Sequence, residues 1–159
     1  MPEHPVDPTL DLVLEREVDV PPHLVWAAWT TPEHLMKWYA PKPYETIECE
    51  IDLRPGGIFR AVMRSPEGET VDEGGGCVLE AVEHRRFVWT AAMGPGFRPV
   101  AVDLPFTAII TLEPAASGTV YRAVAVHGSP ETRTAHENMG FHEGWGAALD
   151  QLVEVARGL

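Results

Sequence analysis

The 159-residue sequence is long enough for one domain that buries about 70% of its unfolded surface, so no second domain is needed. Its 24 acidic and 12 basic residues give a net charge of −12, which opposes binding to nucleic acid or to anionic lipid. No stretch reaches the ~18 apolar residues of a membrane span, and the start of the chain lacks the basic and apolar regions of a signal peptide. We therefore expect a soluble, cytoplasmic protein.

The chain is predicted to start with a flexible, proline-containing lead-in over residues 1–9, followed by a single domain over residues 10–159. Residues 10–20 predict a strand, because apolar and acidic side chains alternate there. Arg16 is the exception, since it falls on the apolar phase of this strand. It either anchors a carboxylate inside the domain or extends to the rim, and a structural ion pair is the simpler interpretation.

Two short helices are predicted after this strand. The first covers residues 23–31. The second starts at Thr31-Pro32-Glu33, where a capping threonine, a proline and an acid form a typical helix start, and it runs to about Tyr39. The helices carry three tryptophans, which we interpret as core side chains: Trp26, Trp29 and Trp38.

The following segment alternates between strands and turns. Six strands are predicted, at residues 44–53, 58–64, 77–82, 87–90, 106–112 and 119–127. The sequence leaves open which face of the strands at 77–82 and 119–127 points inward. Cys49 and Cys77 fall in separate strands, and we expect two free thiols. The proline- and glycine-rich residues 93–105 predict a long loop, which is a candidate lid over a cavity.

The last element is a long amphipathic helix over residues 139–157, which a helical turn at residues 131–138 precedes. At 100° per residue, Phe141, His142, Trp145 and Leu152 fall on one apolar arc, and Gly158 is a stop signal. A sheet that is apolar on one face needs such a helix to cover it. The fold class expected is therefore α+β, with a curved sheet wrapped around the C-terminal helix.

Three segments carry a resemblance to a known family: residues 22–38, residues 54–59 with the sequence Arg-Pro-Gly-Gly-Ile-Phe, and residues 140–152. Together they resemble the Hsp-ATPase-activator-homologue family, a member of the START-like, or SRPBCC, helix-grip superfamily. The resemblance implies a seven-stranded antiparallel sheet around the C-terminal helix, with a hydrophobic cavity between them. It does not imply one activity, because the superfamily includes lipid carriers, polyketide cyclases, hormone receptors and chaperone activators.

Metal and nucleophile motifs do not stand out in the sequence. The pairs His136-Glu137 and His142-Glu143 lie six residues apart, whereas a helical zinc motif needs histidines four residues apart, so we predict neither a metal site nor a cofactor. A small polar set falls on faces expected to be apolar. With its aromatic surroundings it forms the predicted ligand-binding site: Arg16, Phe59, Met63, Trp89, Phe106, Tyr121, His127, Asn138, Phe141, His142 and Trp145.

We expect this site, between the sheet and the C-terminal helix, to bind a hydrophobic, aromatic small molecule without catalysis, as a carrier, sensor or sequestering protein. One alternative is a cyclase of the polyketide type, in which His142 or His127 acts as general acid or base. Another is a protein-interaction module of the chaperone-activator kind, although the companion domain of those activators is missing from this sequence. The sequence leaves the ligand's identity and a homodimer open.

Overall fold

A computed structural model describes residues 4–72 and 74–159 of the chain. Its elements follow in the order β1 (Asp11–Val18), α1 (Pro22–Thr30), α2 (Pro32–Leu35), β2 (Glu45–Ile51), β3 (Ile58–Arg64), β4 (Thr70–Val71), β5 (Gly76–Val82), β6 (Arg86–Thr90), β7 (Met93–Gly94), β8 (Arg98–Pro99), β9 (Thr107–Ala115), β10 (Gly118–Val126), α3 (Pro130–Asn138) and α4 (Phe141–Arg157). None of the described helices is long and apolar enough to cross a bilayer.

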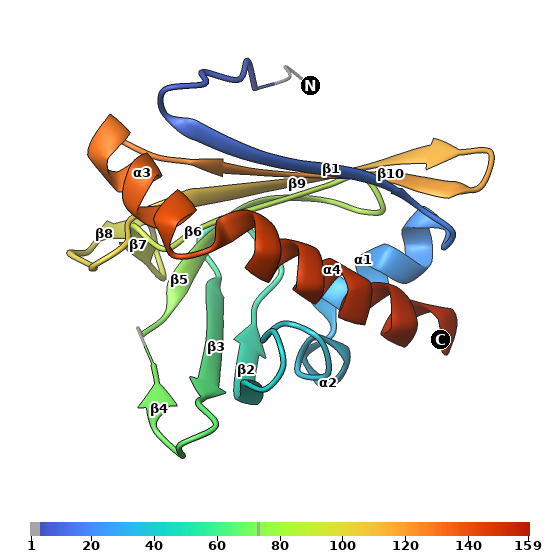
Figure 1. The fold of residues 1–159 in the computed structure, drawn as a ribbon, viewed down its shortest axis with the longest axis horizontal. Helices are drawn as coiled ribbons and strands as arrows, with labels where there is room; N and C mark the ends of the chain where they lie inside the picture. The colour runs from blue at the N-terminus through green and yellow to red at the C-terminus, as the bar shows by residue number, and fades with distance from the viewer. Residues whose placement is uncertain (1–3, 73) are drawn as a thin grey trace.

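The main sheet is antiparallel, with the strand order β1-β10-β9-β6-β5-β3-β2, and the short β4 pairs with β3. It curves around α4, so that β1, β9 and β10 pass along one side of the helix and β2 and β3 lie on another (Figure 1). The predicted α+β helix-grip fold, with seven antiparallel strands and a C-terminal helix, is confirmed.

Two β-bulges interrupt the sheet, one between Thr46 and Glu48 and one between Val78 and Glu80. A bulge bends a strand and shifts its side-chain alternation by one residue. In β5, Val78 therefore pairs with Trp89 and Ala81 with Phe87, and all four pack in the concave core. This shift explains why simple alternation left the inward face of residues 77–82 undecided.

The strand β10 has a regular alternation. Tyr121 and Ala123 belong to the core under the helix, whereas Val124 packs on the convex face with Val88 and Ile109. The inward face left open by the sequence is therefore the one that carries Tyr121.

The two short helices depart from prediction at one end. α1 ends at Thr30, close to the expected boundary, but α2 ends at Leu35 and gives way to turns. Thr31 occupies the N-cap position, yet its side chain makes no capping hydrogen bond. Instead, tertiary packing holds the following residues, because the buried Trp38 indole donates to the carbonyl of Ala28 over 2.9 Å. All three tryptophans of this region are buried, as predicted.

The C-terminal region contains two helices rather than a turn that continues into one. α3 is a full helix, whose cap is the Ser129 hydroxyl that accepts from the Thr132 amide over 3.2 Å. Gly140, with φ at +92°, separates α3 from α4 by a left-handed residue. The long helix therefore starts at Phe141, two residues later than predicted.

Smaller differences concern the ends and loops. The predicted loop at residues 93–105 includes the β7–β8 hairpin, with Gly96 and Phe97 in left-handed conformations at its turn. Both cysteines are free, as expected. Residues 1–3 of the predicted flexible lead-in lie outside the described residues. Among the others, His4 Nε2 lies 2.8 Å from a carboxylate oxygen of Asp11, at the start of β1. The flexibility of the lead-in stays a prediction.

Candidate functional site

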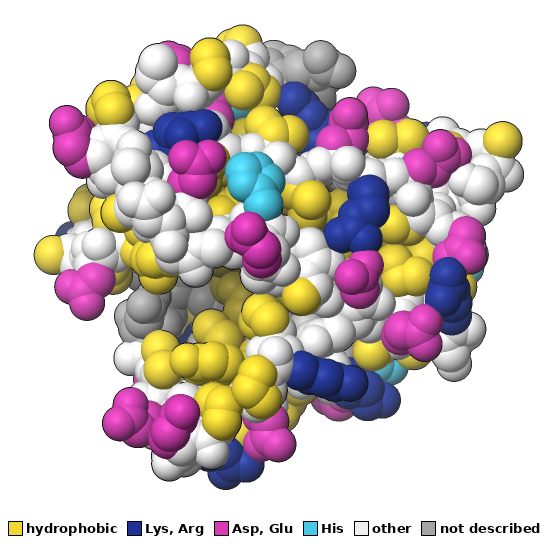
Figure 2. Space-filling model, in the orientation of Figure 1, with side chains coloured by type: hydrophobic (Ala, Val, Ile, Leu, Met, Phe, Trp, Pro, Cys, Tyr) yellow, Lys and Arg dark blue, Asp and Glu magenta, His cyan; other side chains and the backbone are white. Residues whose placement is uncertain are grey.

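A cavity of about 340 Å³ lies between the concave face of the sheet and the N-terminal half of α4. It opens on the face where α3, α4 and the β3–β4 hairpin meet, and Figure 2 shows a hollow there bordered by hydrophobic side chains. Val71 and Met139, both exposed, belong to the lining. Seven predicted site residues also line it: Phe59, Met63, Trp89, Phe106, Tyr121, Phe141 and Trp145.

The walls of the cavity are aromatic. Phe59 stacks on Trp89, with ring centroids 4.4 Å apart and an angle of 17° between the planes. Phe106 contacts Trp89 edge-on at 5.5 Å and Trp145 at 6.0 Å, and Trp145 lies 4.8 Å from Phe141. These rings come from β3, β6, α4 and the segment before β9, so the fold alone brings them together. Flat apolar walls of this kind favour a planar apolar ligand.

One side of the cavity carries the Tyr121 hydroxyl. The Trp29 indole N–H donates to this oxygen over 3.0 Å. Burial raises the pKa of Tyr121 well above its usual value, and the Trp29 hydrogen bond only partly opposes that effect. The phenol therefore keeps its proton, for which no acceptor is found among the described residues.

Another side carries a pair of buried histidines. His127 Nδ1 lies 2.7 Å from the Leu10 carbonyl oxygen, and His127 Nε2 lies 2.9 Å from His136 Nδ1. A carbonyl oxygen only accepts, so Nδ1 of His127 carries a proton, and in the neutral ring its Nε2 is an acceptor. His136 Nδ1 must then donate to it. In the neutral pair, Nε2 of His136 is left as an unprotonated acceptor.

The protonation of His136 follows from its surroundings. Burial, and to a smaller extent the neighbouring His127, lower the pKa of His136 to about 4. The ring is therefore neutral near pH 7. His136 lines the cavity, and its Nε2 has no hydrogen-bond partner among the described residues.

A third polar group is the indole nitrogen of Trp89. This side chain is 4% exposed, and its Nε1 has no hydrogen-bond partner among residues 4–72 and 74–159. A buried donor without a partner is uncommon in native proteins and calls for an explanation. One explanation is a bound molecule that accepts a hydrogen bond from the Trp89 indole N–H.

Four predicted site residues do not line the cavity. His127 is buried, but it stands behind His136. Arg16 takes the rim position that the sequence allowed: its guanidinium pairs with Asp150 and donates to the Gly146 carbonyl over 3.0 Å. Its side chain is 40% exposed, so the ion pair is a surface one.

The expected inward orientation of His142 and Asn138 is wrong, because both side chains are exposed. In α4, Phe141 and Trp145 point into the cavity. His142 follows Phe141 directly, so its side chain is rotated by about 100° away from the face that these two residues share. In α3, His136 points inward, and Asn138, two positions later, points to nearly the opposite side of the helix.

His136 is the functional candidate that sequence reasoning missed. The sequence presents it only as one member of a possible metal pair, and residues 131–138 are predicted to form a helical turn with no assigned face. The Ser129-Pro130-Glu131 start is typical of a regular helix and could have indicated that its face had to be assigned. No group of three or more metal-ligating side chains occurs in the described part of the chain.

Comparison with known proteins gives the following matches. The family described as Activator of Hsp90 ATPase homolog 1-like protein matches residues 19–157. A solved structure from Nitrosomonas europaea is 46% identical, with a TM-score of 0.92 over 96% of this chain and 97% of that one. One from Mycobacterium smegmatis is 27% identical, with a TM-score of 0.77 over 92% and 90%. An AHSA1-like protein from Aeromonas hydrophila, at 18% identity and a TM-score of 0.69 over 94% and 93%, shares the fold. No curated protein matches the chain.

Proposed function

Because this chain belongs to the Activator of Hsp90 ATPase homolog 1-like family and holds an aromatic cavity under its last helix, we propose that it binds a hydrophobic, aromatic small molecule there without transforming it. The observation that carries the proposal is the cavity itself. Its volume of about 340 Å³ is at the lower end of the ~300–1,000 Å³ typical of small-molecule sites. A ligand of a few fused or linked rings suits this space better than a long acyl chain.

The histidines support binding rather than catalysis. A general base works best when its pKa is near the working pH, and the pKa of His136, lowered to about 4, makes it a weak base. His127 uses both ring nitrogens in hydrogen bonds within the protein, and His142 lies on the surface. These observations count against the cyclase alternative, in which His127 or His142 moves a proton.

The proposal is tested by titration with N-phenyl-1-naphthylamine, an uncharged fluorophore whose emission rises in apolar surroundings. We expect saturable binding at one site per chain. Ala148→Phe should weaken binding at least about tenfold, because Ala148 lines the cavity and the added ring occupies it. The matched control is Ala147→Phe, since Ala147 is only half-buried and lies outside the described lining.

Ala61→Leu narrows the cavity from the sheet side and serves as a second variant if Ala148→Phe does not fold. Circular dichroism confirms that each variant keeps its structure. Absence of saturable binding to the wild type, or equal affinity of the wild type and the folded cavity variants, would overturn the proposal.

A further inference from the structure

The polar groups that line the cavity without a partner indicate what kind of ligand it accepts. This inference rests on the proposed binding function and goes beyond it. Besides the Tyr121 hydroxyl, two such groups differ in character, because the Trp89 indole offers a proton and His136 Nε2 offers a lone pair. Both side chains are more than nine-tenths buried, at 4% and 5% exposed. The Trp89 nitrogen itself is inaccessible to water, and a ligand that supplies the matching groups gains affinity.

The acceptor character of His136 is determined within the protein. The Leu10 carbonyl holds the proton on His127 Nδ1, and His127 Nε2 in turn takes the proton from His136 Nδ1. This series of bonds leaves the lone pair of His136 Nε2 for a ligand. Such an acceptor favours a ligand that carries a hydroxyl or another hydrogen-bond donor.

The Trp89 indole favours a ligand with a hydrogen-bond acceptor. Its N–H only donates, so its partner must be an acceptor, such as a carbonyl or ether oxygen. The ring of Phe106 contacts both Trp89 and His136, with centroids 5.5 and 4.8 Å apart. One ligand of a few rings that lies against Phe106 is therefore next to both side chains.

The described residues of the lining are all uncharged at neutral pH. Among its described residues there is no aspartate, glutamate, lysine or arginine. An ionised ligand would lose its hydration in this cavity and find no opposite charge, which is far more costly than burying a neutral polar group. At the rim, the guanidinium of Arg16 is already paired with Asp150.

We propose that the ligand is an uncharged aromatic molecule with a hydroxyl group that donates to His136 and an oxygen that accepts from Trp89. Hydroxylated aromatic ketones and ethers have this character. Carboxylates, phosphates and sulfonates do not, although many of them have equally apolar rings.

The first test compares naphthalene derivatives with the wild-type protein, by displacement of N-phenyl-1-naphthylamine below pH 7. We expect 2-naphthol to bind about twofold to tenfold more tightly than 2-methoxynaphthalene, which has no donor. 2-Acetylnaphthalene should exceed 2-ethylnaphthalene by a similar factor, because only the ketone accepts from Trp89. Naphthalene-2-sulfonate should bind at least about tenfold more weakly than 2-naphthol.

Variants then assign each preference to its residue. His136→Phe should remove the preference for 2-naphthol, while His142→Phe, an equivalent change on the exposed face, should keep it. Trp89→Phe should remove the preference for the ketone and leave that for 2-naphthol. If His136→Phe does not fold, the wild-type comparison of 2-naphthol with 2-methoxynaphthalene still tests the preference.

The outcomes separate this inference from the proposed function. If neither N-phenyl-1-naphthylamine nor any naphthalene binds, the binding function itself is wrong. If the naphthalenes bind but the hydroxyl and ketone bring no gain, or if the sulfonate binds as tightly as 2-naphthol, the cavity binds aromatic molecules and the inference about their polar groups is wrong. Preferences that persist in both variants would also overturn it.

Discussion

The two halves of α4 cover the same sheet with the same apolar stripe, yet one half packs on a filled core and the other on a cavity. In the C-terminal half, Leu152 and Ala156 are fully buried and pack against the main core. In the N-terminal half, Phe141 and Trp145 line the cavity. Hydrophobic periodicity thus shows which face of a helix is covered, but it does not show whether the space opposite is filled.

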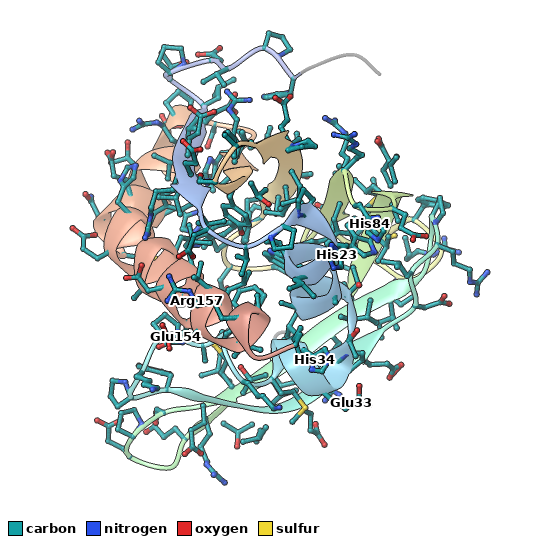
Figure 3. The ribbon with its side chains drawn as sticks, turned by 90° about the vertical axis from the view of Figure 1, so that its right-hand side faces the viewer. His23, Glu33, His34, His84, Glu154 and Arg157 are labelled. Atoms are coloured by element: carbon teal, nitrogen blue, oxygen red, sulfur yellow. The ribbon has the colours of Figure 1, made fainter. Side chains whose placement is uncertain are left out.

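The filled half owes its packing to α1. This helix lies beside the C-terminal half of α4 (Figures 1 and 3) and brings Val25 and Trp29 into the core. At its start, His23 contacts His84 of the β5–β6 turn, with ring centroids 6.3 Å apart (Figure 3). At the end of α4, Arg157 pairs with Asp19, so this half is held at both its core and its rim. Trp145 instead faces the cavity and the ring of His136 from α3, with centroids 6.1 Å apart.

The filled half should be the more sensitive to truncation of a side chain. Leu152→Ala removes a fully buried side chain from packed surroundings, and we expect the free energy of unfolding to fall by about 2–5 kcal/mol. Urea denaturation measures this loss. Affinity for N-phenyl-1-naphthylamine should not change in the folded variant. A loss below ~1 kcal/mol would mean that this half also has free space.

The half of α4 that covers the cavity should make the stability of the protein depend on pH, through the buried His136. The pKa of His136 is lowered to about 4 in the folded protein, whereas an unfolded histidine titrates near 6.5. Between these values the unfolded chain binds the proton more readily. The free energy of unfolding should therefore fall as the pH drops from about 6.5 to about 4, by up to roughly 3 kcal/mol.

Urea denaturation at several pH values, for wild type and His136→Phe, isolates this contribution, because the carboxylates titrate in both proteins. We expect the stability of the variant to depend less steeply on pH within that range. Equal slopes for the two proteins would contradict the assignment of a buried neutral His136.

Two glycines at the start of α4 sharpen the comparison further. Gly140 has φ at +92°, so Gly140→Ala should cost about 1–2 kcal/mol. Gly144 lies within the helix, and an added methyl would meet Pro41 at 4.0 Å, an ordinary contact. Gly144→Ala should therefore stabilise the protein by about 0.5–1 kcal/mol. Thermal and urea denaturation of the pair test both signs, and a destabilised Gly144→Ala would argue against free space beside this turn.

The smallest effect is expected at His142. Because its side chain is exposed, His142→Phe should change the free energy of unfolding by less than about 0.5 kcal/mol and should leave probe binding unaltered. Denaturation and titration of this variant check both. Reduced probe affinity would return His142 to the site in which the sequence placed it.

These differences show what could be predicted from sequence. The strands, the covering helix and seven cavity residues followed from family resemblance and from alternation and turn residues, and the last two are properties of single elements. His136 and His142 required the phase of a helix start, which one glycine, Gly140, resets. The unpartnered nitrogen of Trp89 required the positions of all its neighbours at once. A local sequence pattern contains neither the rotational phase of a helix nor the hydrogen-bond partner of a buried side chain.

The bond between His127 and the Leu10 carbonyl joins positions 117 residues apart. What it requires at position 10 is a peptide oxygen, and every amino acid provides one. Relatives could therefore carry different residues there and still present the same acceptor to a ligand. Aligned sequences would show variation at a position on which the chemistry of the cavity depends, so the constraint would emerge only when backbones are superimposed.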